Sequence, residues 1–444
     1  MTKIIVLDDD PTGSQTVHSC LLLTRWDRDT LMQGLLDQSP IFFILTNTRA
    51  LEPESAATVT QQVCRALQGV LAETGIRDFL VVSRSDSTLR GHYPVETDVI
   101  AAEMGGFDAH FLVPAFFEGG RFTRDSVHYL MVNGVPTPVH ETEFARDSVF
   151  GYHHSFLPDY VAEKTSGRIG RDRVERFQLT DIRQGCVERL MALTGNTCAV
   201  VDGEVQSDLD RFAADILTAV GRGKRYLFRS AASWLTALAQ LPPQPVSAAT
   251  MASYRHSDHP GAILVGSHVR LTTEQVQDLV AAEVGKTIVT LEVPMTPDLA
   301  DRAKQIQQQV LMGAIAAHEQ GMTVLIYTSR QELTFASRSE RLAFGQVVSQ
   351  TLMAVIQGLP KTLGFLISKG GITSNDTLSA GLNLATARLL GQILPGVSVV
   401  TTPSDHPRFG AMPVVLFPGN VGDRTALTTV YRRLAGLTGV GSLV

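Results

Sequence analysis

The sequence predicts an α/β protein with two domains, each built on a mostly parallel β-sheet. The chain has 444 residues, a length that favours two or three domains over one. In both halves, short apolar runs of strand length alternate with longer helix-like segments, which is typical of parallel, doubly wound sheets. Hydrophobic residues make up 44% of the chain and charged residues 18%, as in globular proteins with ample cores.

The first half contains strand-like runs that each end in polar or turn residues. They cover residues 4–7, 41–45, 79–82, 109–113 and 198–201. Residues 53–74 are predicted to form a helix, because Pro53 lies near the start and Gly75 lies just past the end.

The alternation stops at residues 241–261 and then starts again. Closely spaced prolines and a stretch rich in His, Ser and Pro predict a linker there. His256 and His259 have HxxH spacing, but two histidines without further ligands indicate linker residues rather than a metal site. Further strands are predicted at 262–265, 324–327, 364–367 and 414–417, and helices from about 272, over 298–320 and over 338–357. The predicted domains therefore cover residues 1–240 and 262–444.

Charge and cysteine content bear on the class of protein. The net charge is −6 without a long basic run, so nucleic acid is not expected as a partner. The four cysteines lie far apart without a CxxC pair, which indicates reduced thiols and a cytoplasmic location. No secretion signal and no apolar run of membrane-spanning length is visible, so no membrane partner is expected. The sequence favours no particular assembly and leaves a homodimer open.

The first predicted strand runs directly into three carboxylates, Asp8, Asp9 and Asp10, and then into a turn at residues 11–14. In open α/β sheets, ligands bind beyond the carboxyl ends of the strands. Adjacent acids repel one another, and burying them is costly without a cation, a basic partner or a transferable proton. The acids are therefore predicted to lie at a functional site; the alternative is a solvated acidic turn.

Residues 83–91 follow another predicted strand and combine two arginines, Arg84 and Arg90, with Asp86 and four hydroxyl side chains that include Ser85. This mixture suits a small polyhydroxylated anion. Arginine binds a carboxylate through two hydrogen bonds, while Asp, Ser and Thr pair with hydroxyls. Arg121 is a candidate to extend the site. The alternative is an ordinary capped turn with surface arginines.

Three turns rich in Gly, Ser and Thr follow predicted strands in the second half. They lie at 266–267, 369–374 and 419–422. Backbone N–H groups at such turns can bind anions, and glycine allows phosphate to approach closely. Three such turns in one domain predict a nucleotide pocket, although neither a Walker A loop nor a GxGxxG motif is present.

Taken together, these motifs resemble the four-carbon acid sugar kinase family. In the first half the resembling motifs are DDDPTG (8–13), SDSTLRG (85–91), VPAF (113–116) with GR (120–121), and ETEFARD (141–147). In the second half they are GSH (266–268), TSR (328–330), GGITS (370–374) and PGNVG (418–422). The resemblance spans nearly the whole chain. It implies a kinase that uses ATP and Mg²⁺ to phosphorylate a sugar acid such as threonate, erythronate or 3-oxo-tetronate.

The same resemblance implies a substrate domain at the N-terminus, a nucleotide domain at the C-terminus and an active site in the cleft between them. Asp8 and Asp9 are the candidates for the base that accepts the proton of the attacking hydroxyl. The implied substrate contacts are Asp10, Arg84, Ser85, Asp86 and Arg90. The implied ATP contacts are Ser267, Gly370, Gly371, Ile372, Thr373, Gly419 and Gly422. Metal ligands stay unassigned.

The chain departs from the family's pattern at one position. Many members carry an acid after the paired glycines, where this chain has Ile372 and the nearest acid is Asp376. If that acid helps to hold Mg²⁺, this protein must hold the ion otherwise. The Ile version is interpreted as a subgroup with a different sugar acid.

Two other functions fit part of the sequence. A haloacid dehalogenase-like phosphohydrolase would use Asp8 and Asp10 in a DxDxT pattern, with residues 45–47 and Asp202 as later motifs. This reading leaves the three glycine-rich turns without a role. A non-catalytic sensor of sugar acids or nucleotides would bind both ligands without turnover, yet it has little need of a carboxylate cluster at a strand end.

Overall fold

The computed structural model describes residues 2–330, 333, 335 and 337–437. The chain divides into two compact units, Met1–Pro242 and Pro243–Val444. Residues 1 and 438–444, at the outer ends of the two predicted domains, lie outside the described residues. Each unit has its own sheet and hydrophobic core, so each is described by itself.

The first unit is built on a parallel sheet with strand order β2-β3-β1-β4-β11-β5-β10-β9. These strands are β1 Lys3–Asp8, β2 Leu21–Leu23, β3 Ile41–Leu45, β4 Phe79–Arg84, β5 Ala109–Val113, β9 Glu175–Phe177, β10 Thr197–Val201 and β11 Tyr226–Ser230. The central strands are buried almost throughout. Strands covered on both faces read as continuous apolar runs, which is why most of them are visible in the sequence.

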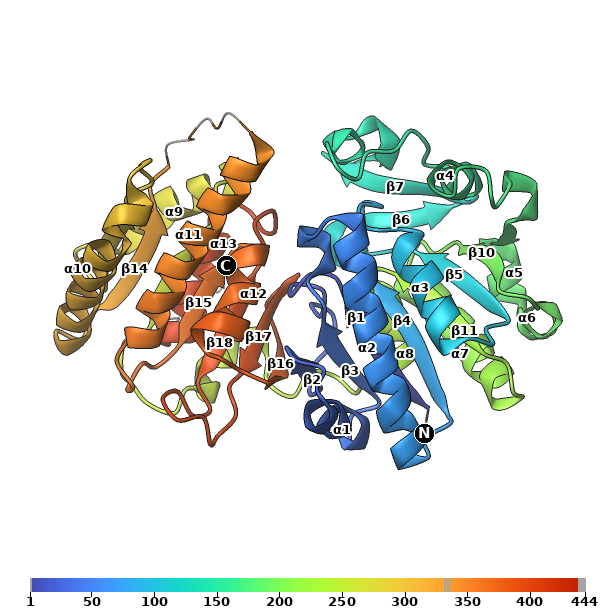
Figure 1. Cartoon of the computed structure of the whole chain (residues 1–444), viewed down its shortest axis with the longest axis horizontal. Helices are drawn as coiled ribbons and strands as arrows, with labels where there is room; N and C mark the ends of the chain where they lie inside the picture. The colour runs from blue at the N-terminus through green and yellow to red at the C-terminus, as the bar shows by residue number, and fades with distance from the viewer. Residues whose placement is uncertain (1, 331–332, 334, 336, 438–444) are drawn as a thin grey trace, which may run out of the picture. The chain divides into compact units, whose positions relative to one another are not determined.

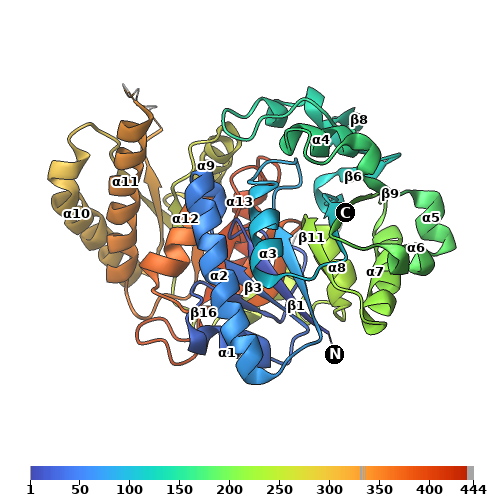
Figure 2. The same cartoon turned by 45° about the vertical axis from the view of Figure 1, so that its right-hand side comes forward.

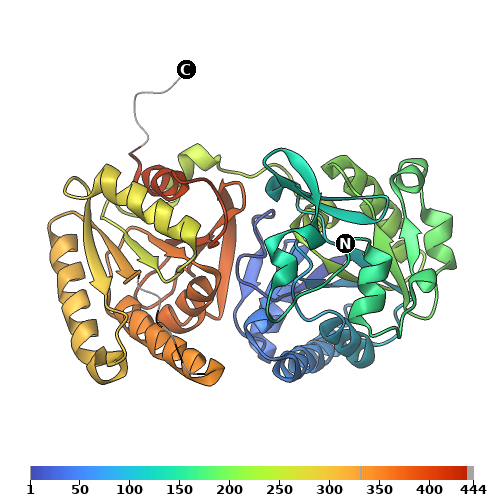
Figure 3. The same cartoon turned by 90° about the horizontal axis from the view of Figure 1, so that it is seen from above.

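Helices cover both faces of this sheet, with α2 and α3 on one face and α7 and α8 on the other (Figures 2 and 3). The helices are α1 Arg28–Leu36, α2 Pro53–Thr74, α3 Val95–Met104, α4 Leu157–Lys164, α5 Leu179–Gln184, α6 Val187–Ala192, α7 Gln206–Gly221 and α8 Ala232–Ala239. The predicted helix 53–74 is confirmed. Pro53 is its first residue and Gly75 ends it in the left-handed conformation, with φ of 69°.

A small antiparallel sheet, β6-β7-β8, is inserted after β5 in the first unit (Figure 1). Its strands are β6 Arg121–Arg124, β7 Val127–Val132 and β8 Val135–Pro138. It is joined to the rest of the unit by isolated bridges from Thr123 to Gly203 and from Val127 to Phe156. This sheet is not predicted from the sequence.

The second unit has a mixed sheet with strand order β13-β14-β12-β15-β18-β17-β16. Strands β12 to β15 and β18 pair in parallel, whereas β17 pairs antiparallel with both β18 and β16. The strands are β12 Ala262–Val265, β13 Ile288–Val293, β14 Thr323–Thr328, β15 Leu366–Lys369, β16 Thr386–Leu394, β17 Val397–Thr401 and β18 Pro413–Phe417. The predicted α/β fold with mostly parallel sheets is thereby confirmed.

Helices α9 and α13 cover one face of the second sheet, and α10 and α11 cover the other (Figure 3). The helices are α9 Arg270–Glu283, α10 Leu299–Glu319, α11 Arg338–Gly358, α12 Gly371–Asp376 and α13 Ala426–Ala435. Among the residues that the structure describes, no helix combines the length and the apolar composition that crossing a membrane requires.

The segment 241–261 is more ordered than a linker. It contains the 3₁₀ helix Ala248–Tyr254, and Met251 is fully buried in the core of the second unit together with Phe365.

A boundary also differs at β15, which begins at Leu366 and extends to Lys369 instead of covering 364–367. Ser368 and Lys369 are polar but fully buried, so an apolar run alone does not reveal where this strand ends.

Candidate active site

The acids predicted at the end of β1 lie beside the polar ends of two other strands. In the register of the first sheet, Asp8 is paired with Arg84 at the end of β4, and Arg84 is paired with Ser230 at the end of β11. The carboxyl ends of the three parallel strands therefore meet at one edge. This is the edge at which open α/β sheets bind their ligands.

Asp9 is fully buried and surrounded by guanidinium groups. Arg49 donates hydrogen bonds to both of its carboxylate oxygens, and the Ser85 hydroxyl donates to Oδ2 at 2.6 Å. Arg84 Nη1 lies 3.8 Å from Oδ1. Burial alone would raise the pKa of Asp9, but the positive charges of Arg49, Arg229 and Arg84 outweigh it and lower the pKa. Asp9 is therefore held as a carboxylate.

Asp8 is equally buried but has fewer partners. Its Oδ1 accepts from Arg84 Nη1 at 3.4 Å and from the Asp10 backbone N–H at 3.3 Å, while Oδ2 has no hydrogen-bond partner among the described residues. Burial raises the pKa of Asp8 to about 7; Arg84 opposes the shift and the charges of Asp9 and Asp10 add to it. The carboxyl group is therefore poised to gain or lose a proton near neutral pH.

Gly13 lies directly against the Asp8 carboxyl group. A Cβ atom at this position would lie 2.1 Å from both carboxylate oxygens. The glycine of the DDDPTG motif is therefore required for space, because any side chain would displace Asp8.

Arg49 links the acids of two strand ends. It donates to Asp10 Oδ2 at 3.3 Å, and its Nη1 lies 4.0 Å from Asp86 Oδ1. Asp86 also accepts from Arg90 Nε at 2.8 Å. Burial opposes ionisation of Asp86, but Arg90 and Arg49 outweigh this effect and lower its pKa. The predicted residues Asp8, Asp9, Asp10, Arg84, Ser85, Asp86 and Arg90 thus form one connected cluster.

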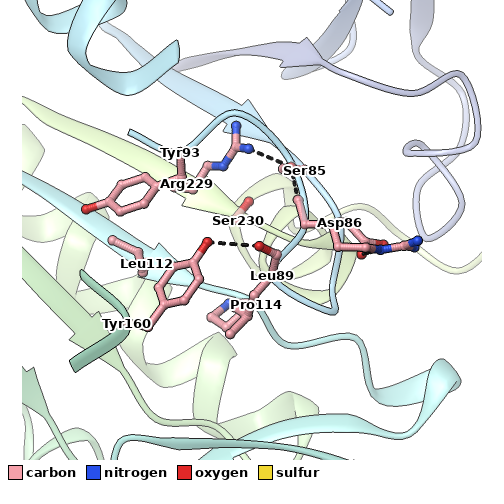
Figure 4. Close-up of a pocket in the computed structure, with 10 residues that line it drawn as sticks. Ser85, Asp86, Leu89, Tyr93, Leu112, Pro114, Tyr160, Arg229 and Ser230 are labelled. Carbon is pink, nitrogen blue, oxygen red and sulfur yellow. Dashed lines mark hydrogen bonds and ion pairs between the residues drawn. The ribbon is translucent and has the colours of Figure 1, made fainter. Parts of the chain in front are cut away.

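A small pocket opens at this cluster (Figure 4). Tyrosine, leucine and proline side chains line part of the pocket, and its polar wall comes from Ser85, Asp86, Arg90, Arg229 and Ser230. The Ser230 hydroxyl is buried without a hydrogen-bond partner among the described residues. The pocket encloses about 20 Å³, which is room for about one water molecule. A larger ligand requires its wall to move.

Two arginines of this site, Arg229 and Arg49, are not predicted from the sequence. Arg229 donates to Ser83 Oγ at 2.7 Å, to Ser85 Oγ at 2.7 Å and to Glu96 Oε2 at 2.5 Å. Its strand, β11, escapes detection because Arg and Ser interrupt the apolar run. Arg49 follows the predicted strand 41–45 closely, so its position after a strand end was a usable signal.

Two predictions change with this geometry. Arg84 is buried against the carboxylates, so it neutralises Asp8 and Asp9 instead of presenting a clamp to a ligand. Asp202, the third acid of the phosphohydrolase alternative, ends β10, which is four strands from β1 in the sheet. At about 4.8 Å per strand the separation is roughly 19 Å. Asp202 Oδ1 instead accepts from the Ser126 backbone N–H at 2.8 Å.

In the second unit, the three glycine-rich turns follow adjacent strands. Val265 of β12, Lys369 of β15 and Phe417 of β18 are paired in register. The turns consequently converge at Ser267. A Cβ atom on Gly370 would lie 3.1 Å from Ser267 Cβ, and one on Gly419 would lie 3.1 Å from Ser267 Oγ.

The contacts of the other predicted nucleotide residues differ. Thr373 packs against Gly266, where an added Cβ would lie 2.3 Å from its hydroxyl oxygen. Gly371 and Ile372 begin α12, and the Ile372 side chain is 65% exposed. Gly422 does not join the convergence at Ser267, since its neighbours are Ala426 and Gln275.

Arg330, which follows β14, is a further candidate of this site. Its Nη1 donates to the Ser267 carbonyl oxygen, while Nε and Nη2 are buried without hydrogen-bond partners among the described residues. Two adjacent free donors of a guanidinium match two oxygens of a phosphate group. In the sequence, Arg330 is recognised only as part of the TSR motif.

Lys369 supports the turn after β18. Its ammonium group is fully buried, donates to the Pro418 carbonyl oxygen at 2.6 Å and lies 3.7 Å from the centre of the Phe417 ring. Burial lowers the pKa of Lys369 to about 6. Lys369 therefore holds the turn that carries Gly419.

The described residues contain no group of three or more His, Cys, Asp or Glu side chains that could hold a metal ion. A Mg²⁺ ion commonly keeps several waters and binds through one or two carboxylates plus substrate phosphates. The donor set is therefore compatible with an ion that arrives with a nucleotide.

Comparison with models of protein families shows which family the chain belongs to. A model of a sugar-binding N-terminal domain matches residues 4–238, more than half of the chain, and a model of a nucleotide-binding C-terminal domain matches residues 262–427. The chain belongs to the four-carbon acid sugar kinase family. The acid cluster thus lies in the sugar-binding domain of this family, and the convergent turns lie in its nucleotide-binding domain.

A D-erythronate kinase of Heliobacterium modesticaldum is similar in sequence to this chain. The two are 28% identical over 226 residues, which cover 48% of each protein. The match therefore spans about half the length of that relative.

One solved structure shows the same fold at low sequence identity, and a second solved structure is a weaker match. A protein from Salmonella typhimurium LT2, described as a "putative tRNA synthase", is 18% identical, covers 97% of this chain and 99% of its own, and has a TM-score of 0.70. A DUF1537 domain from Bordetella bronchiseptica, with bound citrate in a domain-swapped dimer, is 20% identical and covers 98% of both chains. Its TM-score is 0.42.

Proposed function

We propose that the protein phosphorylates a hydroxyl group of a four-carbon sugar acid, such as threonate, erythronate or 3-oxo-tetronate, with ATP as the donor. The observation that carries the proposal is the Asp8 carboxyl group, which is buried at the ligand-binding edge with one unpartnered oxygen and a pKa raised to about 7. The D-erythronate kinase relative supports the substrate class.

Asp8 rather than Asp9 is the proposed general base. A base works best when its pKa lies near the operating pH, and Asp8 meets this condition. Asp9 is bound by Arg49 and Ser85, which stabilise its charge and weaken it as a proton acceptor. The free Oδ2 of Asp8 lacks the donor that a substrate hydroxyl would supply.

The pocket beside the acids is the proposed sugar-acid site. Arg90 has guanidinium nitrogens beyond its bond to Asp86, so it can bind the substrate carboxylate. Asp86, Ser85 and Ser230 offer partners for hydroxyl groups. Because the pocket holds about one water molecule, binding must displace part of its wall.

The convergent turns of the second unit are the proposed phosphate site. Gly370 and Gly419 let the turns approach one another closely at Ser267. Arg330 offers two donors that have no partner among the described residues. Phosphoryl transfer depends mostly on positioning and electrostatic stabilisation, which these groups can provide. Mg²⁺ would arrive bound to the ATP phosphates. The placement of the site between the two domains, the homodimer and the cytoplasmic location stay predictions.

The alternatives predict different results. A phosphohydrolase would hydrolyse a phosphate ester without ATP, and the distance of Asp202 from Asp8 counts against it. A sensor would bind sugar acid and nucleotide without turnover.

The test is an ATP-consumption screen with Mg²⁺ against D- and L-threonate, D- and L-erythronate and their 2-oxo and 3-oxo relatives. We expect turnover on at least one acid. Asp8→Asn should lower turnover by about 100-fold or more while ATP still binds, as expected for the loss of a general base. Asp210→Asn, at an exposed acid on α7, is the matched control and should keep full activity. Unchanged turnover in Asp8→Asn would remove Asp8 from the mechanism.

A further inference from the structure

The second unit contains a pocket that extends beyond the residues predicted to contact ATP. It encloses about 200 Å³ and lies between helices α11 and α12 and the segments that follow β12 and β13. Its apolar walls come from Met295, Val348, Leu352, Met353 and Ile372. Its polar lining includes His268, Ser349 and Asp376.

This pocket adjoins the convergent turns. Gly266 and Thr373 line the pocket, and they also pack against each other at the base of the turns beside Ser267. A ligand with its phosphates at Ser267 and Arg330 would therefore reach the pocket with its remaining part. Apolar walls with a few fixed polar groups are typical of sites for small organic ligands.

Two residues of the lining, Ile372 and Asp376, suggest which kind of ligand the pocket can bind. Ile372 lies on the pocket wall and is 65% exposed, so its side chain is accessible to a ligand in the pocket. Asp376 is half-buried, accepts from Ser349 through Oδ2 and accepts from Asn375 Nδ2 through Oδ1 at 3.1 Å. A carboxylate has about four acceptor positions, so Asp376 is held in place with capacity for another donor.

We propose that this pocket takes the adenine ring of the nucleotide. Ile372 packs against the ring, and the Asp376 carboxylate accepts a hydrogen bond from the exocyclic amino group. A base with a carbonyl oxygen at that position would place an acceptor against the carboxylate, so it is rejected. The inference rests on the nucleotide part of the proposed function.

The test measures binding to the full-length protein by calorimetry with three probes: ADP, IDP and inorganic pyrophosphate. IDP carries a 6-oxo group in place of the 6-amino group of ADP, and pyrophosphate lacks a base. We expect the wild-type protein to bind ADP at least about tenfold more tightly than IDP, since the bond accepted by a charged group is lost. In Asp376→Ala this preference should fall to nearly one.

Ile372→Ala should weaken ADP and IDP together and leave pyrophosphate binding unchanged. Asp301→Ala, at an exposed acid on α10, is the control and should change none of the affinities. Retained pyrophosphate binding shows that a variant is folded; if Asp376→Ala loses it, Asp376→Asn replaces that variant with the same expected fall in preference.

An undiminished preference for ADP in the Asp376 variant would overturn the assignment, and so would tighter binding of IDP than ADP to the wild-type protein. These outcomes are separate from the kinase proposal. A chain that prefers ADP through Asp376 but phosphorylates no sugar acid supports the pocket and contradicts the proposed reaction. A chain that consumes ATP with a sugar acid while Asp376→Ala keeps the preference contradicts only the pocket.

Discussion

Asp8 and Asp9 are neighbours with the same burial, yet their surroundings shift their pKa values in opposite directions. Asp9 faces the guanidinium groups of Arg49, Arg229 and Arg84, so its charge is stabilised. Asp8 faces one guanidinium group, that of Arg84, and the charges of two neighbouring acids, Asp9 and Asp10. Asp8 is the last residue of β1 and Asp9 is the first residue after it, and their carboxyl groups meet these different partners. When the surroundings push the pKa values of two acids apart, one group can exchange a proton near neutral pH while the other stays charged.

The raised pKa of Asp8 predicts how stability depends on pH. The pKa of Asp8 is about 7 in the folded protein, against the ordinary aspartate value of 3.8, so between these pH values the folded state binds more protons than the unfolded state. The stabilising effect is complete below about pH 4 and is lost as pH rises to about 7, at a cost on the order of 4 kcal/mol. Asp8→Asn removes the titrating group.

Urea unfolding at pH 5 and pH 8 measures this effect. The free energy of unfolding should fall less between these two pH values in Asp8→Asn than in the wild-type protein. Parallel changes in both proteins would show that Asp8 ionises in the folded state as easily as in the unfolded state.

Arg330 predicts a selective loss of nucleotide affinity. Arg330→Gln removes the charge and the two donors that lack partners among the described residues, so KM for ATP should rise by about tenfold or more, the usual range for bonds to a charged group. KM for the sugar acid should stay the same. Steady-state kinetics with each substrate varied in turn measure both constants. The matched control is Arg302→Gln on α10, and an equal rise of KM for ATP in this control would contradict the assignment.

At the scale of elements, two glycines of the first unit show opposite requirements. Gly13 follows β1 and touches the Asp8 carboxyl group, whereas Gly69 lies within α2 with nothing within 4 Å of an added Cβ. Gly69→Ala should raise the free energy of unfolding by up to about 1 kcal/mol, because alanine favours a helix. Gly13→Ala should lower turnover strongly, because it displaces Asp8.

Thermal unfolding and the ATP-consumption assay together measure this pair of variants. Full activity in Gly13→Ala would show that the loop can move away from Asp8 without loss of function.

The elements that the sequence predicts are those with a single strong pattern. Helix α2 has its proline, its glycine and its apolar face, and β1 and β3 are unbroken apolar runs. Strand β11 is missed because it contains Arg229 and Ser230, which are polar but buried. The charge of Arg229 is neutralised by Glu96, which is far away in the sequence. Strand β16 alternates buried and half-buried residues in an antiparallel pair, a pattern outside the parallel rhythm of the chain.

The site follows the same division. The acids after β1 and the polar residues after β4 are visible because both strands are visible, and adjacent strands bring them together. Arg229 requires the strand order β4-β11-β5, which no local pattern reveals. The free donors of Arg330 and the unpartnered oxygen of Asp8 depend on packing and are outside the reach of the sequence.

At the scale of the whole molecule, the two units have separate cores. Buried residues of β12, β15, β18, α9 and α13 form the core of the second unit, and other clusters serve the first. We therefore expect residues 1–242 and 243–444 to fold when they are produced separately. The second fragment should bind ADP, and neither fragment alone should phosphorylate a sugar acid.

Circular dichroism and calorimetry measure folding and binding of the two fragments. A second fragment that folds but does not bind ADP would contradict the location of the nucleotide site.

The strand order of the first sheet also has a consequence for synthesis of the chain. Strand β11 lies between β4 and β5, although Arg229 and its partner Ser83 are 146 residues apart in sequence. On the ribosome, β4 and β5 emerge long before β11, so their facing edges stay unpaired and prone to aggregation until it arrives. Pulse-labelled hydrogen exchange during refolding should show β11 amides protected no earlier than those of β10. A nascent chain that stops short of β11 carries Glu96 without its cation, so an interrupted protein cannot assemble a working site.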